Sequence, residues 1–352
     1  MELDSLKNEN SIYSKFRNFM LDKEFRKVHK MMGQYLEEYK QEIENIYPHK
    51  HFKVAELEDI VFEMLEDKPQ LFRYQNKQGK NLGMIACSYG LSRVVDKYIL
   101  DESVCFQQDN KGYNIGMYAA GGGLEESVLK CFYNIELLKQ KSLLGDNIPL
   151  FAAENSLEKA TLKALDIKEV VTAQNDLGYN IGMYAIKSGL NRASLKALEN
   201  DELATQQDNT YSFNMGMWAI QYKNTQVALK ALDNNEASLQ KDNLGRNMGI
   251  LAADKGLEDC VIKSLDNENS RWQYTNLGFN ITKSISEKGL ESAMLKALDC
   301  DDLIGHYDVK GLDVVKYALK MQNPVVDRKL KMKELVYDIE AAREDLEIGL
   351  QV

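Results

Sequence analysis

One asparagine recurs through this chain at an almost constant interval. It is found at Asn81, Asn114, Asn147, Asn180, Asn214, Asn247 and Asn280, in steps of 33 residues with a single step of 34. Asp313 takes the same place in an eighth, weaker copy. A period of this length is typical of a repeat protein, in which each unit packs on its neighbours because it cannot bury its apolar face alone. We therefore predict an array of small, similar units.

The order of residues within a unit predicts two antiparallel helices followed by an extended connector. In "GYNIGMYAAGGGL" (112–124), Asn114 stands where a helix N-cap would accept a bond from a free amide. Gly123 is placed to end the first helix. The apolar stripe of the second helix is formed by Leu124, Val128, Leu129 and Phe132, at spacings of one to four residues.

These features resemble the ankyrin repeat, a 33-residue unit of turn, helix, turn and helix. The resemblance extends over residues 53–322 and is also carried by "GDNIPLFAAENSL" (145–157) and "GRNMGILAADKGL" (245–257). It implies an all-α, ankyrin-type helical repeat solenoid with about seven units, decayed end units and helical caps. It also implies that the chain binds other proteins on the concave side of a curved array.

The chain departs from the family pattern in a systematic way. Asparagine replaces the family's threonine and methionine often replaces its histidine, so the threonine-to-histidine hydrogen-bond ladder is absent. Glycine replaces a leucine at Gly83, Gly116, Gly182, Gly216 and Gly249. Because glycine costs about 1 kcal/mol relative to alanine inside a helix, we expect backbones to approach closely there, with methionines filling the gaps between units.

Helical segments flank the predicted array. Residues 53–72 resemble the second helix of a unit that has lost its first. Residues 1–52 include an amphipathic helix whose apolar positions are Phe25, Val28, Met32, Tyr35, Tyr39, Ile43 and Ile46. This helix packs on the array or, alternatively, binds a partner or a second copy of the chain through residues 25–46. Residues 323–352 form a predicted C-terminal capping helix with Leu330, Leu335, Val336, Ile339 and Leu346 on its apolar face.

Charge and hydropathy restrict the class of partner. The formal net charge of −10 argues against nucleic-acid binding, which needs concentrated basic residues. The N-terminus has no secretory signal pattern, and no 18-residue window is uninterruptedly apolar. We expect a cytoplasmic protein without a membrane partner, with export as an effector lacking a cleavable signal as the alternative. The five scattered cysteines predict small buried side chains in a reducing compartment.

No catalytic or cofactor motif is evident. The glycine-rich stretch lacks both G-K-[ST] and G-x-G-x-x-G, and it recurs as only a structural element would. Pairs such as Asp109-Asn110 fit tight turns better than calcium loops. His49 and His51 have no third ligand at suitable spacing. We therefore expect no cofactor, no metal and no enzymatic activity, although a toxin-like effector with an unrecognised activity in the N-terminal segment stays as an alternative.

A row of lysines recurs in the second helix of six units. Its members are Lys130, Lys163, Lys196, Lys230, Lys263 and Lys296. Most such rows are solvated faces that keep an array soluble. An acidic partner or a lipid headgroup is the alternative reading.

Aromatic residues at repeated positions are the predicted partner-binding surface, because they offer large contact area at little entropic cost. The predicted residues are Tyr89, Tyr113, Tyr179, Tyr211, Phe213, Trp218, Tyr222, Arg246 and Phe279. Packing of hairpin against hairpin is the alternative role. The irregular unit at 209–224, which holds the 34-residue step, is the favoured place for a ligand.

The function predicted from sequence is therefore a non-catalytic protein-binding scaffold, monomeric or oligomerising through residues 25–46. We expect Tyr179→Ala combined with Phe213→Ala to weaken partner binding and to leave the melting temperature nearly unchanged. An unidentified protein is the expected partner.

Overall fold

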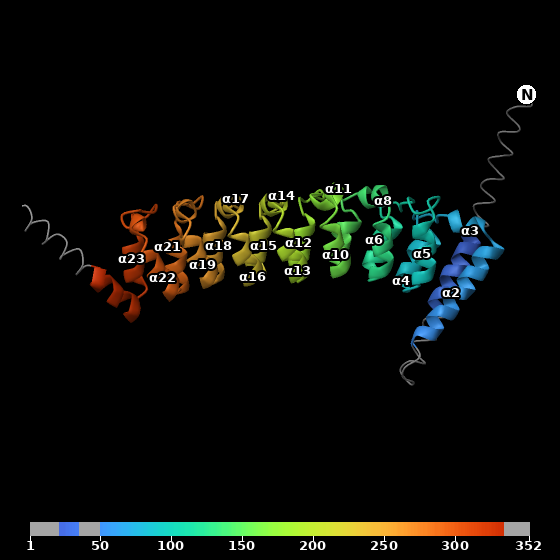
Figure 1. The fold of residues 1–352 in the computed structure, drawn as a ribbon, viewed down its shortest axis with the longest axis horizontal. Coiled ribbons are helices and arrows are strands. Elements are labelled where there is room, and N and C mark those ends of the chain that lie inside the picture. The colour runs from blue at the N-terminus through green and yellow to red at the C-terminus, as the bar shows by residue number, and fades with distance from the viewer. Residues whose placement is uncertain (1–20, 35–49, 334–352) are drawn as a thin grey trace, which may run out of the picture. The chain divides into compact units, whose positions relative to one another are not determined.

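The computed structural model describes residues 21–34 and 50–333, and over these ranges the chain is helical with no strand. A single isolated β-bridge joins Gln108 and Asn114. The chain divides into two compact units between Asp176 and Leu177, called unit 1 and unit 2 below. Helix pairs recur within each unit, as Figure 1 shows. The predicted all-α class is confirmed.

Unit 1 starts with helical residues 21–34 and continues through repeating helix pairs. Its helices are α2 (Lys50–Asp67), α3 (Gln70–Arg73), α4 (Leu82–Ser88), α5 (Ser92–Leu100), α6 (Ile115–Gly121), α7 (Glu125–Cys131), α8 (Ile135–Lys139), α9 (Ile148–Glu154), α10 (Glu158–Ala164) and α11 (Lys168–Val171). The first helix of each pair packs on the first helices of the neighbouring repeats, as α6 does on α4 and α9. The second helices pack on one another in the same way, as α7 does on α5 and α10.

Unit 2 repeats this organisation and ends with helical residues 324–333. Its helices are α12 (Ile181–Lys187), α13 (Asn191–Ala197), α14 (Asp201–Thr205), α15 (Met215–Gln221), α16 (Thr225–Ala231), α17 (Asn235–Leu239), α18 (Met248–Lys255), α19 (Glu258–Leu265), α20 (Glu268–Arg271), α21 (Ile281–Lys288), α22 (Glu291–Leu298), the 3-10 helix η1 (Asp301–Leu303) and α23 (Val314–Lys320).

The predicted pair of helices is confirmed in the 33-residue repeats of both units. The prediction of an extended connector between repeats is wrong. A third helix of four or five residues lies in most connectors: α8, α11, α14, α17 and α20. The physical reason is a second set of caps. Asn134, Asn200 and Asn234 each accept a hydrogen bond from the amide three residues later, at 3.1, 3.2 and 2.9 Å.

The recurring asparagine is confirmed as a helix cap in six of its seven copies. In α6, for example, the Met117 amide donates to Asn114 Oδ1 at 3.0 Å. Asn280 differs because the hydroxyl of Thr282, which stands where other units have glycine or proline, donates to Asn280 Oδ1 at 2.6 Å. Asp313 caps α23 in the eighth copy.

The asparagine has a second role that sequence reasoning missed. Asn114 Nδ2 donates to Gln140 Oε1 at 3.0 Å, and Gln140 Nε2 donates to the Phe106 carbonyl of the preceding repeat at 3.0 Å. The same chain runs from Asn214 through Gln240 to the Thr205 carbonyl at 2.9 and 2.7 Å. This asparagine–glutamine ladder satisfies buried polar groups between repeats.

The repeated helix glycines allow side chains, not backbones, to approach closely. A Cβ added at Gly116 would lie 2.3 Å from Ile148 Cδ1, and one added at Gly216 would lie 2.3 Å from Met248 Cε. The prediction of close backbone contact is therefore wrong at these positions. The residue that fills the gap is the one directly after the next capping asparagine.

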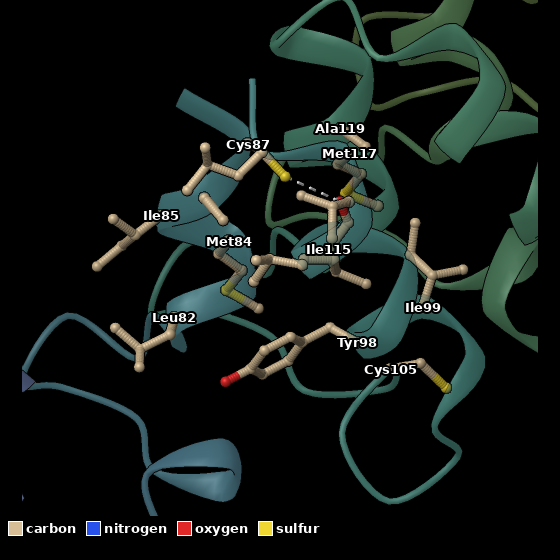
Figure 2. Packing of buried hydrophobic residues seen from close by; sticks show 14 of the residues in the cluster. Leu82, Met84, Ile85, Cys87, Tyr98, Ile99, Cys105, Ile115, Met117 and Ala119 are labelled. Carbon is tan, nitrogen blue, oxygen red and sulfur yellow. Dashed lines mark hydrogen bonds between the residues drawn. The ribbon is translucent and has the colours of Figure 1, made fainter. Parts of the chain in front are cut away.

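The core of unit 1 is formed by the buried faces of successive helix pairs, as the close view in Figure 2 shows. Met84, Ile115 and Met117 are each at most 1% exposed. Cys87 Sγ lies 3.9 Å from the Ile115 carbonyl oxygen, the contact drawn as a dashed line. All five cysteines are buried and free, as predicted. Burial raises the pKa of the Cys260 thiol to about 11, so it is protonated at neutral pH.

The N-terminal helix packs on the array over its described part. Phe25, Val28 and Met32 are at most 1% exposed and join the core with residues of α2. Lys68 Nζ bonds to Glu24 Oε2 at 2.7 Å. The predicted domain boundary at residue 52 falls within α2. Positions 35–46 of the predicted helix lie outside the described residues, as do His49 and the side chain of His51.

The C-terminal segment covers the last repeat of unit 2. Val326 and Leu330 are buried. Lys329 Nζ reaches Asp299 Oδ2 at 2.5 Å, and Lys333 Nζ reaches Asp301 Oδ1 at 2.8 Å. The predicted cap is confirmed to residue 333, whereas Leu335, Val336, Ile339 and Leu346 lie outside the described residues.

Candidate partner-binding groove

A buried aspartate organises the turn that leads into α6. Asp109 Oδ1 accepts bonds from the amides of Lys111 and Tyr113 at 2.8 and 2.9 Å, and Oδ2 accepts from the Tyr118 hydroxyl at 2.7 Å. This is the turn chemistry that the Asp-Asn pairs predicted. It fixes Tyr118, on the first helix, relative to Tyr113 at the turn.

An open groove of about 550 Å³ lies in unit 1 across the first helices of three successive repeats. Its lining comes from α4, α6, α9 and the adjoining turns: Cys87, Ser88, Gly90, Tyr113, Met117, Tyr118, Gly121, Gly122 and Phe151. We call this feature the unit 1 groove. Its volume suits one side chain and part of a peptide backbone, within the range of ordinary ligand sites.

Two adjacent glycines open the groove. A Cβ added at Gly121 would meet no atom within 4 Å, so the space beside it is empty. A Cβ added at Gly122 would lie 2.6 Å from the Cys87 carbonyl oxygen, so the backbones of α4 and α6 approach closely there. The corresponding positions elsewhere carry side chains, such as Lys187 and Ser188 in α12 and the residue after it.

Three aromatic rings form one wall of the groove, and we call Tyr113, Tyr118 and Phe151 the unit 1 triad. The Tyr113 ring centroid lies 6.2 Å from that of Tyr118 and 5.3 Å from that of Phe151, both edge to face. All three rings are partly exposed. Lys80 Nζ stands 4.9 Å from the Tyr118 ring centroid, but Lys80 is not a lining residue.

The groove has an electronegative setting. Burial, followed by the Asp146, Asp109 and Glu154 carboxylates, raises the pKa of Tyr113. Burial, followed by the hydrogen bond to Asp109, raises the pKa of Tyr118. Both hydroxyls are therefore protonated at neutral pH, and the charges near the rings are these carboxylates and the Lys80 ammonium beside Tyr118.

The matching positions of unit 2 form a second triad that is filled from within. We call Tyr179, Tyr184 and Trp218 the unit 2 triad. Its centroids are separated by 5.4 Å from Tyr179 to Tyr184 and 5.6 Å from Tyr179 to Trp218. Lys187, at the position of Gly121, holds its ammonium 4.2 Å from the Tyr179 centroid, 5.2 Å from Tyr184 and 5.6 Å from Trp218.

Three of the predicted contact residues are not accessible. Tyr179, Phe213 and Trp218 are 8%, 6% and 6% exposed, so the prediction that they present a binding surface is wrong. Trp218 Nε1 also donates to the buried Asp208 Oδ2 at 3.0 Å. Removing Tyr179 and Phe213 would therefore lower the melting temperature, contrary to the prediction from sequence.

The remaining predicted residues are divided between surface and structural roles. Tyr211 and Tyr222 stay exposed at 50% and 49%, beside Trp218. Tyr89 lies against the N-terminal helix, its ring 6.2 Å from that of His29.

Phe279 and Arg246 have partners within unit 2. The Phe279 ring lies near two ammonium groups, those of Lys283 at 4.8 Å and Lys310 at 5.3 Å. The Arg246 guanidinium pairs with Asp242 at 2.8 Å and Asp254 at 3.1 Å, so the expected role of Arg246 in partner contact is replaced by an internal one.

Four lysines of the row contact the preceding repeat. Lys263 Nζ bonds to Asp233 at 2.5 Å and Lys296 Nζ to Asp266 at 2.7 Å, each reaching a carboxylate of the preceding repeat. Lys130 pairs with Asp96, and Lys163 lies over Phe132 and Tyr133. These pairs are half-exposed and each contributes little to stability. Within each unit, these four lysines are therefore engaged by neighbouring side chains.

Within residues 21–34 and 50–333, no group of three or more histidine, cysteine or acidic side chains is arranged to hold a metal ion. Over the same residues, no helix combines the length and apolar character needed to cross a membrane.

Comparison with solved structures gives remote likenesses, one of which is described here. No protein-family model matches the chain, and no curated protein matches it. A chain in the solved structure of the Bd0816 predatory endopeptidase from Bdellovibrio bacteriovorus in complex with the immunity protein Bd3460 aligns with 18% sequence identity and a TM-score of 0.44. The alignment covers 54% of the present chain and 97% of the other.

Proposed function

We propose that this chain is a divergent ankyrin-type repeat protein that binds a protein partner without catalysis, and that the unit 1 groove is its contact site. The observation that carries the proposal is the open groove of about 550 Å³, lined by partly exposed rings and left without side chains at Gly121 and Gly122. Exposed aromatic pockets are preferred sites for the anchor side chains of partners.

The position of the groove supports the same proposal. Each of its three first helices is held by its own pair and by the neighbouring repeat, so the lining is supplied by rigid elements rather than by long loops. A preformed site lowers the entropy lost on binding. The carboxylates near Tyr113 and the net charge of −10 favour a partner with positive charge at the contact.

Affinity capture with a blocked groove tests this proposal. Gly121→Trp places a large side chain in the open space, and Gln221→Trp places the same side chain at the exposed, equivalent end of α15 in unit 2. Proteins captured by the wild type and by Gln221→Trp, but not by Gly121→Trp, would be groove partners. Identical capture by all three proteins would contradict the assignment of the groove.

A further inference from the structure

The two triads occupy the same place in nearly identical stretches of sequence. Residues 112–124 read "GYNIGMYAAGGGL" and residues 178–190 read "GYNIGMYAIKSGL". The stretches differ only at three consecutive positions, where Ala120, Gly121 and Gly122 in unit 1 correspond to Ile186, Lys187 and Ser188 in unit 2. The unit 2 triad therefore has a lysine at the end of its own first helix, whereas the unit 1 triad has glycine there and only Lys80 of the preceding repeat near one ring, 4.9 Å from the Tyr118 centroid.

Unit 2 shows what such a triad binds. The Lys187 ammonium lies within 5.6 Å of three ring centroids, inside the distance of about 6 Å at which a cation is attracted to the negative face of an aromatic ring. The side chain also fills the space beside the rings. Tyr179, Tyr184 and Trp218 are 8%, 6% and 6% exposed there, whereas their counterparts in unit 1 are partly exposed.

We infer that the unit 1 groove binds a lysine side chain of the protein partner, whose ammonium takes the place beside Tyr113, Tyr118 and Phe151 that Lys187 takes in unit 2. This inference rests on the proposed protein-binding function and adds the chemistry of the bound residue. The apolar stem of the lysine would run along Met117 and the glycine floor, which line the same groove.

Charge around the two sites agrees with this assignment. The Asp109, Asp146 and Glu154 carboxylates act on Tyr113, and the buried Asp109 accepts a hydrogen bond from the Tyr118 hydroxyl. Among the described residues, these three carboxylates outnumber the one cation near the triad, Lys80, whose ammonium lies 4.9 Å from the Tyr118 centroid. Carboxylates hydrogen-bonded to a tyrosine hydroxyl leave the ring more electron-rich and favour a cation at its face. A glutamate or aspartate of a partner would instead meet like charge.

The test uses small probes on the full chain. We would titrate n-butylammonium chloride, with 1-butanol as the uncharged control, and follow the aromatic NMR signals of both triads. In the wild type, n-butylammonium should shift the signals of Tyr113, Tyr118 and Phe151 more than those of the unit 2 triad, and 1-butanol should bind about tenfold more weakly.

A reciprocal exchange of the two residues sharpens the test. Gly121→Lys, which points into open space, should abolish the response of the unit 1 triad, and Lys187→Gly should create a response at Tyr179, Tyr184 and Trp218. Equal binding of butanol and butylammonium, or no response at the unit 1 triad, would overturn the inference.

A peptide selection separates failure of this inference from failure of the proposed function. Displayed peptides would be selected on the wild type with excess Gly121→Trp protein as competitor, so that only groove binders are retained. The expected binders contain a lysine whose replacement by norleucine lowers affinity about tenfold. Groove binders that tolerate norleucine would contradict the lysine assignment but keep the protein-binding function, whereas a selection that retains no groove binder would contradict both.

Discussion

The groove of unit 1 and the filled triad of unit 2 differ most clearly at the end of the first helix, where Gly121 corresponds to Lys187. In unit 2, Lys187 lies against Tyr179, Tyr184 and Trp218 and helps to bury them. In unit 1, Gly121 leaves Tyr113, Tyr118 and Phe151 partly exposed around a groove of about 550 Å³.

This difference shows how a repeat protein can form a groove where one repeat lacks side chains that its other repeats carry. The capping asparagine, the helix glycine and the aromatic positions are common to both stretches, so the scaffold is the same. What separates a packed surface from an open groove is the loss of side chains at Gly121 and Gly122. A cavity that costs stability in one repeat is tolerated because its neighbours hold the helices in place.

The largest expected effect comes from truncating the matched rings. Trp218→Ala removes a ring that is 6% exposed and one of two donors to the buried Asp208 Oδ2, which keeps the Phe213 amide, so we expect a loss of about 3–5 kcal/mol in the free energy of unfolding. Phe151→Ala in the open groove should cost clearly less. Urea unfolding of both variants measures this difference, and equal losses would mean that the two triads are equally packed.

A smaller effect is expected from the glycines of α6. Gly116→Ala places a Cβ 2.3 Å from Ile148 Cδ1 and 3.0 Å from Cys131 Sγ, so we expect a loss of about 1–3 kcal/mol through overpacking. Gly121→Ala meets no atom within 4 Å and should be neutral or stabilise the helix by up to about 1 kcal/mol. Thermal unfolding of Gly116→Ala and Gly121→Ala measures the difference. A larger fall in melting temperature for Gly121→Ala would contradict an open groove beside Gly121.

Removing the hydroxyl of Tyr118 tests the polar side of the groove. Tyr118→Phe breaks the 2.7 Å bond to Asp109 and should cost about 1–2 kcal/mol at pH 7. The pKa of Tyr118 is raised in the folded state, so its contribution is complete below the unfolded pKa of about 10 and falls as the pH rises above that value. The decline of stability above pH 10 should therefore be shallower in Tyr118→Phe, and an unchanged decline would argue against the raised pKa.

The smallest effect concerns the ammonium of Lys187. Lys187→Met keeps an apolar stem and removes the charge, so the loss should be about 0.5–1 kcal/mol from cation–π attraction. Chemical unfolding measures it against Lys255→Met, a lysine in α18 for which no aromatic contact is observed among the described residues. If Lys187→Met lowers the free energy of unfolding no more than the control does, the cation–π contact of Lys187 does not stabilise the fold.

Much of the fold could be predicted from the sequence. The 33-residue period, the capping role of Asn114 and the turn at Gly123 depend on local chemistry, which short sequence patterns express directly. The connector helices and the asparagine–glutamine ladder were missed because a cap such as Asn134 resembles ordinary turn residues, and because Gln140 becomes a partner of Asn114 only after folding.

The candidate site was predicted only in part. Tyr113 was identified correctly as an accessible aromatic residue, but Tyr179 occupies the same repeat position and is buried. Exposure depends on the residue eight positions later in each stretch, Gly121 or Lys187, and no sequence pattern marks the importance of that residue. The "GGG" run, interpreted from sequence as a structural element, includes Gly121 and Gly122, which line the groove.

The most direct test of the match between the two triads is the NMR chemical shift of a lysine placed in unit 1. In Gly121→Lys, the ε-methylene protons of the introduced side chain should be shifted upfield by the rings of Tyr113, Tyr118 and Phe151, as those of Lys187 should be by its own triad. An introduced lysine with the chemical shift of a solvent-exposed side chain, beside an upfield-shifted Lys187, would contradict the equivalence of the two sites.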